Sequence, residues 1–431
     1  MNVIDVLSLV TRYHHTSTRR LHLIPSENSM SLAARVPFLT DVVHRYCFPS
    51  KGENTAWPGT DDAVSIEHAA ISGLRALYGA KYVNVKPISG INCMAVAMSA
   101  LTEPGSTVLS IAESDGGHGA TRFLAERLGL TWIPLPHNRS QFRIDIDRLA
   151  AVAAPVSGPK LVYLDQFMCL FPHDLSAVRA ATGSDTTIHY DGSHVMGLIA
   201  GGQFQDPLSE GADSLGGSTH KSFPGPHKGI LLTNSEHIAR KLDEHAGHWV
   251  SHHHPADVAA LAIVVAELRD NAADYAVQTV HNAQRLGQSL ANRGLRVCAA
   301  EQGFTRSHQL WVDVAPAMDP SAASRALLAA GIVVNAIDIP YLAAGTGLRL
   351  GVQEVTWLGM GVGEMDELAA VFERVLLRGQ DPDLVAADVR RLHDRFARVD
   401  ADQAIQTLLQ TVQRLLTPVE FAEGKSSEEE C

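Results

Sequence analysis

The sequence has few cysteines, and none of them are paired at the spacing of a metal-binding or redox motif. The five cysteines are scattered over 431 residues: Cys47, Cys93, Cys169, Cys298 and Cys431. This pattern excludes a disulfide-stapled scaffold and is typical of a chain kept in a reducing compartment. We therefore expect a cytoplasmic protein.

Positive charge and long apolar runs are also lacking. The formal net charge is −12, whereas nucleic-acid-binding surfaces are basic, so no nucleic-acid partner is expected. The longest strongly apolar run, residues 258–266, has about half the length that a membrane span needs, so no membrane partner is expected. An early Asp5 without a preceding basic segment argues against a secretory signal. The composition, 45% hydrophobic and 19% charged, is that of an ordinary globular enzyme.

Helical and β-rich patterns alternate from about residue 62 to 270, which predicts an α/β domain with a mainly parallel sheet. After a long helix that starts at Pro255, the pattern changes to that of a smaller α+β domain. Strands are expected at 82–85, 107–111, 161–164, 187–190, 229–232, 310–314 and 332–334. The predicted organisation is an N-terminal arm (1–36), a large domain (37–270), a small C-terminal domain (271–379), extra helices (380–416) and an acidic disordered tail (417–431).

Lys221 is the first candidate for chemistry. It lies in the run Ser218-Thr219-His220-Lys221-Ser222, directly before a turn rich in glycine and proline. A buried, conformationally fixed amine stays nucleophilic because desolvation lowers its pKa, which is what a Schiff base requires. An isolated T-H-K would more often be a surface loop, so the case depends on the other motifs.

Three further motifs could serve a flat, phosphorylated cofactor. Asp191 ends a β-rich run, where α/β enzymes bind ligands, and could pair with a pyridinium nitrogen, although it could also cap a helix. His118 follows two glycines and could stack on a ring or move protons; a structural histidine is the alternative. Ser89, Gly90 and Ile91 stand between a strand and a helix, a natural phosphate seat or a simple turn.

Arg349 lies in the glycine-bounded apolar run G-L-R-L-G. A partly buried guanidinium needs an anionic partner, and a substrate carboxylate matches its fork geometry. An internal salt bridge is the alternative.

The run His252-His253-His254 could be interpreted as a metal site, with His245 and His248 close by in sequence. No carboxylate or cysteine completes a ligand set at suitable spacing, so no metal is expected. We expect this run to lie near the cofactor phosphate or a subunit interface.

In their order and spacing, these motifs resemble those of the serine hydroxymethyltransferases, which are fold-type-I enzymes dependent on pyridoxal 5'-phosphate (PLP). The resemblance runs from about residue 20 to 375. The matching segments are 23–28 (L-I-P-S-E-N), 84–90 (N-V-K-P-I-S-G), 116–118 (G-G-H), 191–195 (D-G-S-H-V) and 219–221 (T-H-K). The resemblance implies an aspartate aminotransferase-like fold and a homodimer whose active sites are shared between subunits.

It also implies roles for single residues. Lys221 would form the Schiff base, Asp191 would hold the pyridinium and His118 would stack on the ring. The other implied cofactor contacts are Ser89, Gly90, Ile91, His194 and Ser218. Ser26 and Arg349 would bind the substrate, while Tyr46 and His220 would join His118 and Lys221 as catalytic residues.

Several departures from the family pattern concern folate. The family's Y-A-E-G-Y-P-G is replaced by residues 46–52 (Y-C-F-P-S-K-G), so no glutamate stands in its place and Glu53 is not aligned with it. His227 replaces an arginine, His253 and His254 replace a glycine pair, and the segment between 332 and 349 is shorter. The run G-S-T-H-K-S-F-P-G-P resembles the threonine transaldolases related to this family, which need no folate.

The favoured hypothesis is therefore a folate-independent enzyme that cleaves the Cα–Cβ bond of a β-hydroxy-α-amino acid and transfers the glycyl unit to an aldehyde. Small-molecule amino acids and aldehydes would be its substrates. One alternative is a folate-dependent hydroxymethyltransferase acting on serine or an α-substituted serine. Another is a different PLP reaction on the same scaffold, such as transamination or racemisation. A non-enzymatic descendant is disfavoured because Lys221 and Asp191 are both present.

Overall fold

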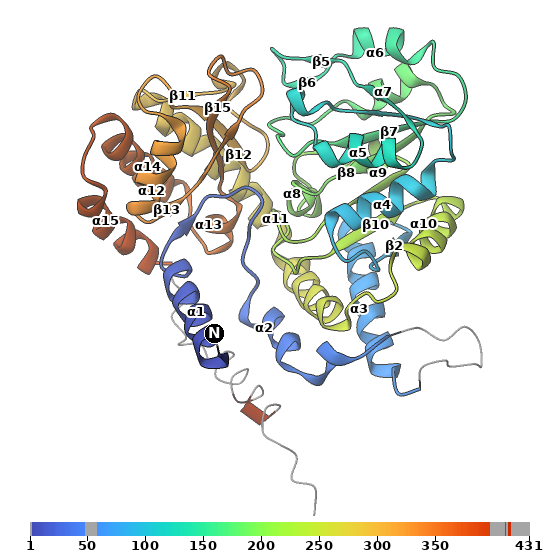
Figure 1. Ribbon diagram of the computed structural model, residues 1–431, viewed down its shortest axis with the longest axis horizontal. Coiled ribbons are helices and arrows are strands. Elements are labelled where there is room, and N and C mark those ends of the chain that lie inside the picture. The colour runs from blue at the N-terminus through green and yellow to red at the C-terminus, as the bar shows by residue number, and fades with distance from the viewer. Residues whose placement is uncertain (1, 48–57, 397–409, 411–412, 415–431) are drawn as a thin grey trace, which may run out of the picture.

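The computed structural model describes residues 2–47, 58–396, 410 and 413–414. The chain forms two halves, each built on its own β-sheet, with α11 (Pro255–Asn292) running between them (Figure 1). No helix within the described ranges is both long enough and apolar enough to span a membrane.

The larger half contains a seven-stranded sheet. Its strands lie in the order β2 (Tyr82–Asn84), β10 (Gly229–Thr233), β9 (Ser214–Ser218), β8 (Thr187–Asp191), β7 (Lys160–Asp165), β3 (Thr107–Ser110) and β4 (Thr131–Pro134). The strand β10 is antiparallel to both of its neighbours, and all other pairings are parallel. This confirms the predicted α/β class with a mainly parallel sheet.

Side chains alternate between the two faces of this sheet, as period-two strands require. On β7, Leu161 and Tyr163 belong to one apolar cluster, and Val162 and Leu164 belong to another. The first cluster packs under α4 (Gly90–Leu101), α5 (Gly119–Arg127) and α10 (Glu236–Trp249). The second packs under α3 (Asp61–Tyr78), α6 (Ile146–Ala153), α7 (Leu175–Thr182), α8 (Met196–Ala200) and the first part of α11. The five inner strands of the sheet are therefore buried on both faces, and these strands lead to the site.

Two strands of the large sheet, β4 and β9, were not predicted. The strand β9 reads Ser-Leu-Gly-Gly-Ser and has little intrinsic β-propensity. Its glycines are required by close packing: a Cβ on Gly217 would lie 2.6 Å from the backbone nitrogen of Ser193, and one on Gly216 would lie 2.8 Å from Leu231. The strand that leads to Lys221 is therefore specified by tertiary contacts.

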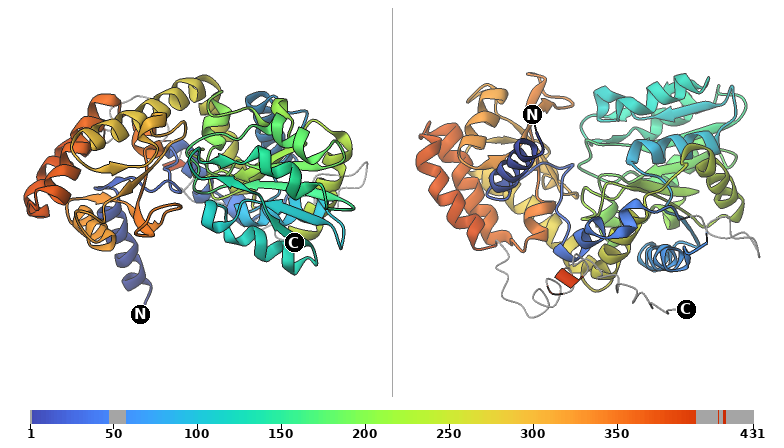
Figure 2. Two further views of the ribbon diagram at one scale, coloured as in Figure 1. Left: turned by 90° about the horizontal axis from the view of Figure 1, so that it is seen from above. Right: turned by 60° about the horizontal axis from the view of Figure 1, so that its bottom comes forward.

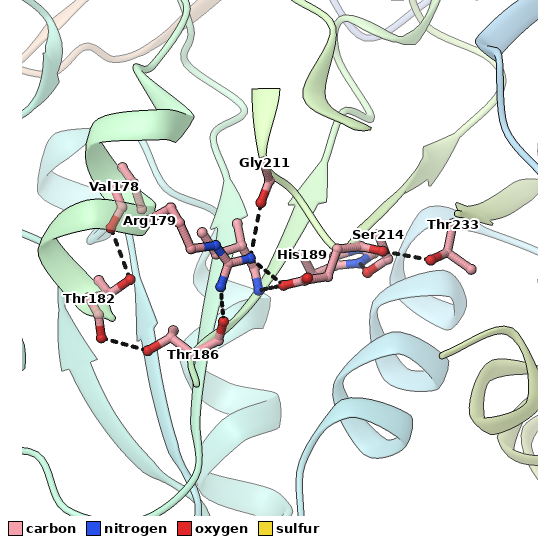
Figure 3. A network of polar contacts seen from close by, with 10 residues as sticks. Val178, Arg179, Thr182, Thr186, His189, Gly211, Ser214 and Thr233 are labelled. Atoms are coloured by element: carbon pink, nitrogen blue, oxygen red, sulfur yellow. Dashed lines mark hydrogen bonds and ion pairs between the residues drawn. The ribbon is translucent and has the colours of Figure 1, made fainter. Parts of the chain in front are cut away.

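The start of β8 and β9 is fixed by a polar network around Arg179 (Figure 3). The Arg179 guanidinium donates to the carbonyl oxygens of Thr186 and Gly211 and forms an ion pair with Asp213 at 2.6 Å. The same Asp213 carboxylate accepts a hydrogen bond from the backbone N–H of Ile188 at 2.7 Å. These bonds anchor the amino ends of the two strands whose other ends lead to Asp191 and Lys221.

The smaller half contains a four-stranded antiparallel sheet. Its order is β11 (Arg296–Val297), β12 (Gln309–Asp313), β15 (Thr346–Gly351) and β14 (Asn335–Asp338). It packs against α12 (Pro320–Ala329), α14 (Val362–Phe372), α15 (Pro382–Asp394) and the end of α11. This agrees with the predicted α+β pattern, and α15 falls within the predicted extra helices; the tail 417–431 lies outside the described residues.

The N-terminal arm lies along the smaller half before it crosses to the larger one. Its helix α1 (Val3–Ser17) has no buried residue and projects from the molecule (Figure 2). The strand β1 (Leu21–His22) then pairs in parallel with β13 (Ile332–Val333). The remaining short elements are α2 (Leu32–Arg35), η1 (Val36–Leu39), η2 (Asp41–His44), η3 (Glu113–Asp115), β5 (His137–Asn138), β6 (Arg143–Ile144), α9 (Pro207–Glu210), η4 (Ala300–Gln302), α13 (Gln353–Trp357) and η5 (Glu373–Leu377).

The two halves share α11, which contributes side chains to both apolar cores. Leu261 and Leu268 lie in the core of the larger half, and Leu286 and Leu290 in that of the smaller half. The predicted boundary near residue 270 thus falls inside one continuous helix, and we keep the division into 37–270 and 271–379 as a proposal.

Candidate active site

Lys221 lies three residues beyond the end of β9, beside the carboxyl ends of β7 and β8. Asp165 and Asp191 are register partners at the ends of those two strands. The pKa of Lys221 lies below its usual value because burial disfavours the ammonium ion, although the nearby Asp191 and Asp165 partly offset this effect. The amine is therefore more readily deprotonated than a surface lysine.

Asp191 is held by two neighbours and is 8% exposed. One carboxylate oxygen accepts a hydrogen bond from Tyr163 Oη at 2.9 Å, and the other accepts from the N–H and hydroxyl of Ser193 at 3.0 and 2.5 Å. Such bonds fix the carboxylate in one orientation. The predicted alternative, a helix cap, is not what the structure assigns: α8 begins at Met196 after Val195.

Asp165 is a second buried carboxyl group beside Asp191, and the sequence analysis did not identify it. It accepts a hydrogen bond from Thr121 Oγ1 at 2.6 Å. Burial, together with the negative charge of Asp191, raises its pKa to about 7. Below about pH 7 the Asp165 carboxyl is mostly protonated, which leaves Asp191 as the carboxylate at this pair of strand ends.

Because the pKa of Asp165 is raised on folding, its contribution to stability is complete below about pH 4 and is lost as the pH rises through about 7. We expect Asp165→Asn, in cofactor-free protein, to remove this pH dependence, which amounts to about 1.4 kcal/mol for each unit of pKa shift. Urea unfolding between pH 4 and 8 measures it. The exposed Asp270→Asn serves as the control, and a variant whose pH dependence equals that of the wild type would contradict the assignment.

The predicted phosphate seat lies where α4 meets the end of β9. The Ser89 hydroxyl caps α4 by accepting from the N–H of Asn92 at 3.1 Å, and Ile91, 57% exposed, lies in the first turn. A Cβ on Gly90 would lie 3.2 Å from the Ser218 Cβ. The buried Ser218 Oγ has no hydrogen-bond partner among the described residues. A helix N-terminus beside an unpaired hydroxyl fits a phosphate group.

His118 is the N-cap of α5, and its Nδ1 accepts from the N–H of Ala120 at 3.2 Å. Burial lowers its pKa, and the positive charge of Lys221 lowers it further. Its ring contacts the Phe167 ring edge-on at 5.9 Å between centroids. The imidazole is therefore neutral near pH 7 and close enough to Lys221 to feel its charge.

Arg349, on β15, brings the smaller half into the site. It is 4% exposed, and its hydrogen-bond partners are all neutral: Gln309 Oε1 at 3.0 Å, the Phe167 carbonyl at 2.6 Å and His194 Nδ1 at 3.3 Å. Within the described residues, no carboxylate lies within ion-pair distance of it. The described residues therefore offer Arg349 no partner for an internal salt bridge, and its buried guanidinium is available to an anionic ligand.

His194 lies between the two cations of the site. Burial lowers its pKa well below the usual value, and the charges of Lys221 and Arg349 act in the same direction. It stacks on His308 at 6.0 Å between ring centroids. A neutral His194 therefore contacts Arg349 and adds no charge to the site.

The N-terminal arm closes the site from one side. Asn28 donates from Nδ2 to the carbonyl of Lys221 at 2.8 Å and to Tyr275 Oη at 3.2 Å. Ser26 lies in the same segment, which reaches β15 where the N–H of Gly351 donates to the carbonyl of Leu23 at 2.8 Å. The sequence analysis missed Asn28 as a positioning residue, although it is part of the L-I-P-S-E-N motif.

Two other predicted residues are placed differently. His220 stacks on His227 at 3.9 Å, burial lowers its pKa to about 3, and its buried Nδ1 has no partner among the described residues. Tyr46 lies against His252, 4.2 Å between ring centroids, and lines an open cavity beside α3. Most of the segment 46–52, with its missing glutamate, lies outside the described residues.

These features define a class, the fold-type-I PLP-dependent transferase fold. They are a mainly parallel seven-stranded sheet, a lysine after β9, an aspartate at the end of the neighbouring β8 and a phosphate-binding site at a helix N-terminus. The residues present fit that cofactor, because Ser218 Oγ is unpaired and Asp191 is fixed by Tyr163 and Ser193.

Comparison with known proteins agrees with this class. The family pattern described as serine hydroxymethyltransferase matches residues 2–372, and the chain belongs to this family. It is 38% identical to a serine hydroxymethyltransferase from Methanopyrus kandleri, over 92% of this chain and 94% of that protein. It is also 38% identical to an L-threonine:uridine-5'-aldehyde transaldolase from a Streptomyces species, over 91% of this chain and 93% of the relative. The crystal structure of an L-threonine transaldolase from Pseudomonas fluorescens matches with a TM-score of 0.86 and 28% identity, over 95% of this chain and 97% of that one. The family is one of PLP-dependent enzymes, as the motifs predicted.

Proposed function

We propose that the protein binds PLP through Lys221 and cleaves the Cα–Cβ bond of a threonine-type amino acid, then transfers the glycyl unit to an aldehyde without folate. The observation that carries the proposal is the pairing of a half-buried amine, Lys221, with a buried guanidinium, Arg349, that has only neutral protein partners. A cofactor anchored at the first and a substrate carboxylate held by the second would set the Cα–Cβ bond in one orientation.

When bound, PLP supplies an electron sink for the electron pair released as the Cα–Cβ bond breaks. Asp191, fixed by Tyr163 and Ser193, would keep a proton on the ring nitrogen. Ser89, Gly90, Ile91 and Ser218 would hold the phosphate. His194 would contact the cofactor beside Arg349, while Ser26 would line the substrate pocket.

The reaction also requires that the β-hydroxyl of the substrate lose its proton. Neutral His118, close enough to Lys221 to feel its charge, would assist by holding the β-hydroxyl oxygen with its Nε2–H, because its Nδ1 lone pair accepts from Ala120; the proton would pass to water. Lys221, once displaced by the substrate amine, can move protons at Cα. His220, next to it in the chain, would shape the pocket.

Folate independence is supported by the sequence, in which residues 46–52 hold no glutamate and the segment between β14 and β15 is short. Tyr341 Oη lies 2.6 Å from His137 Nδ1 and donates to Asp115 Oδ1 at 3.1 Å, which ties this short segment to the larger half. Three of the relatives are named as transaldolases. Five relatives named serine hydroxymethyltransferase, at 33% to 38% identity, favour the second candidate, a folate-dependent hydroxymethyltransferase.

A product assay distinguishes the two functions. With L-threonine and an added aromatic aldehyde, we expect acetaldehyde release and formation of a new β-hydroxy-α-amino acid at rates that tetrahydrofolate does not change. Turnover of L-serine that requires tetrahydrofolate would instead establish the hydroxymethyltransferase.

We also infer a homodimer in which Tyr46 serves the site of the second copy. Support comes from the exposed apolar side chains of α1, such as Ile4 and Leu7 at 73% and 58% exposure, which suit a subunit contact. Analytical ultracentrifugation should give twice the chain mass, and a monomer would contradict the inference.

The cytoplasmic location stays a proposal, supported by four described cysteines that are free thiols.

A further inference from the structure

A buried cluster away from Lys221 brings together three different metal-ligating side chains. Cys47 follows η2, Glu67 lies on α3, and His253 lies two residues before the start of α11. One ligand atom from each lies within 4.8 Å of the other two, and His253 Nε2 is 2.7 Å from Glu67 Oε2. The three residues are 1%, 7% and 4% exposed. The fold thus supplies the cysteine and the carboxylate that the histidine run lacks in sequence.

We propose that Cys47, Glu67 and His253 bind one divalent cation of the zinc class. A thiolate sulfur, an imidazole nitrogen and a carboxylate oxygen are the three ligand types that Zn²⁺ accepts, and three protein ligands leave a fourth position for water. Without the cation, the proton between His253 and Glu67 and the thiol proton of Cys47 occupy these lone pairs. Binding moves the imidazole proton to Nδ1 and releases the thiol proton to solvent.

The charges of the cluster are compatible with a cation. An ionised Glu67 and a Cys47 thiolate together balance two positive charges. Two described lysines act on Glu67: Lys86, which is half-buried, and the buried Lys228, which donates to the carbonyl oxygens of His253 at 2.9 Å and Pro87 at 3.4 Å. Lys228 therefore fixes the backbone of the histidine ligand.

The cluster lies close to an open cavity. Tyr46 and Ile66, each next in sequence to a ligand, line this cavity of about 510 Å³, whereas the three ligands themselves are buried behind it. Tyr46 also lies against His252, the neighbour of His253. A bound cation would therefore clamp the segment that carries Tyr46 onto α3 and the start of α11.

The test uses the full-length holoenzyme, prepared without a histidine tag and stripped with a chelator. Titration with Zn²⁺ against a chromophoric chelator should give one ion per chain, and zinc K-edge absorption should show one sulfur among its ligands. Cys47→Ser should weaken the affinity by at least about 100-fold, beyond the 10–100-fold typical of residues that only orient a ligand. Cys298→Ser, a thiol outside the cluster, should bind zinc as the wild type does.

Cys47→Ser keeps the bond between Glu67 and His253, so its fold should survive, and a thermal melt checks this. Glu67→Gln provides a second variant that should lose the site. Failure of the wild type to take up zinc, or equal binding by the wild type and Cys47→Ser, would overturn the proposal and leave a hydrogen-bonded Glu67–His253 pair covered by a thiol. Loss in Cys47→Ser with retention in Cys298→Ser would establish it.

Discussion

Lys221→Ala should abolish turnover and remove the visible absorption of the bound cofactor. In the proposed function this amine is the covalent attachment point, and among the described residues no other lysine lies at the carboxyl ends of β7, β8 and β9. Losing a covalent catalytic group costs on the order of 10³–10⁶ in rate. Activity with L-threonine and the absorbance spectrum of the purified protein measure the effect.

Lys81→Ala, at an exposed lysine, is the matched control and should leave both signals unchanged. A Lys221→Ala protein that kept the visible band would place the cofactor attachment elsewhere. A variant that lost activity but bound added PLP without forming the band would agree with the assignment, because Ser89 and Asp191 would still hold the cofactor.

Arg349→Lys should lower kcat/KM for L-threonine by about 10²–10³, that is by about 3–4 kcal/mol. The planar guanidinium is held by Gln309 and Phe167, and the shorter, non-planar ammonium cannot keep these bonds while it also grips a carboxylate. An amino alcohol that lacks the carboxylate tests specificity: the wild type should prefer L-threonine strongly, and the variant should lose most of that preference.

The exposed Arg285→Lys should behave as the wild type does, since its Asp366 partner lies outside the site. An equal loss of kcat/KM for both substrates in Arg349→Lys would show that Arg349 supports the fold of β15 and does not select the carboxylate.

Sequence could predict the elements whose signals are local. The apolar strand β7 and the Ser89 cap of α4 follow from pattern alone, and the T-H-K and D-G-S-H-V motifs pointed to the cofactor residues. The strand β9 could not be predicted, because its glycines are explained only by the approach of Ser193 and Leu231. Hydrogen bonds between residues far apart in the sequence could not be predicted either. Asn28 bonds to Lys221, 193 positions away, and His253 bonds to Glu67, 186 positions away.

The helix α11 has a consequence for how the molecule can move. Its 38 residues span about 57 Å, and one unbroken ladder of backbone hydrogen bonds joins the core under Lys221 to the core under Arg349. A continuous helix of this kind resists sharp bending, because a kink would break backbone hydrogen bonds. The two halves therefore have no hinge within α11. The distance between the Lys221 amine and the Arg349 guanidinium is set when the chain folds, and we expect substrates to enter past the loops and the N-terminal arm.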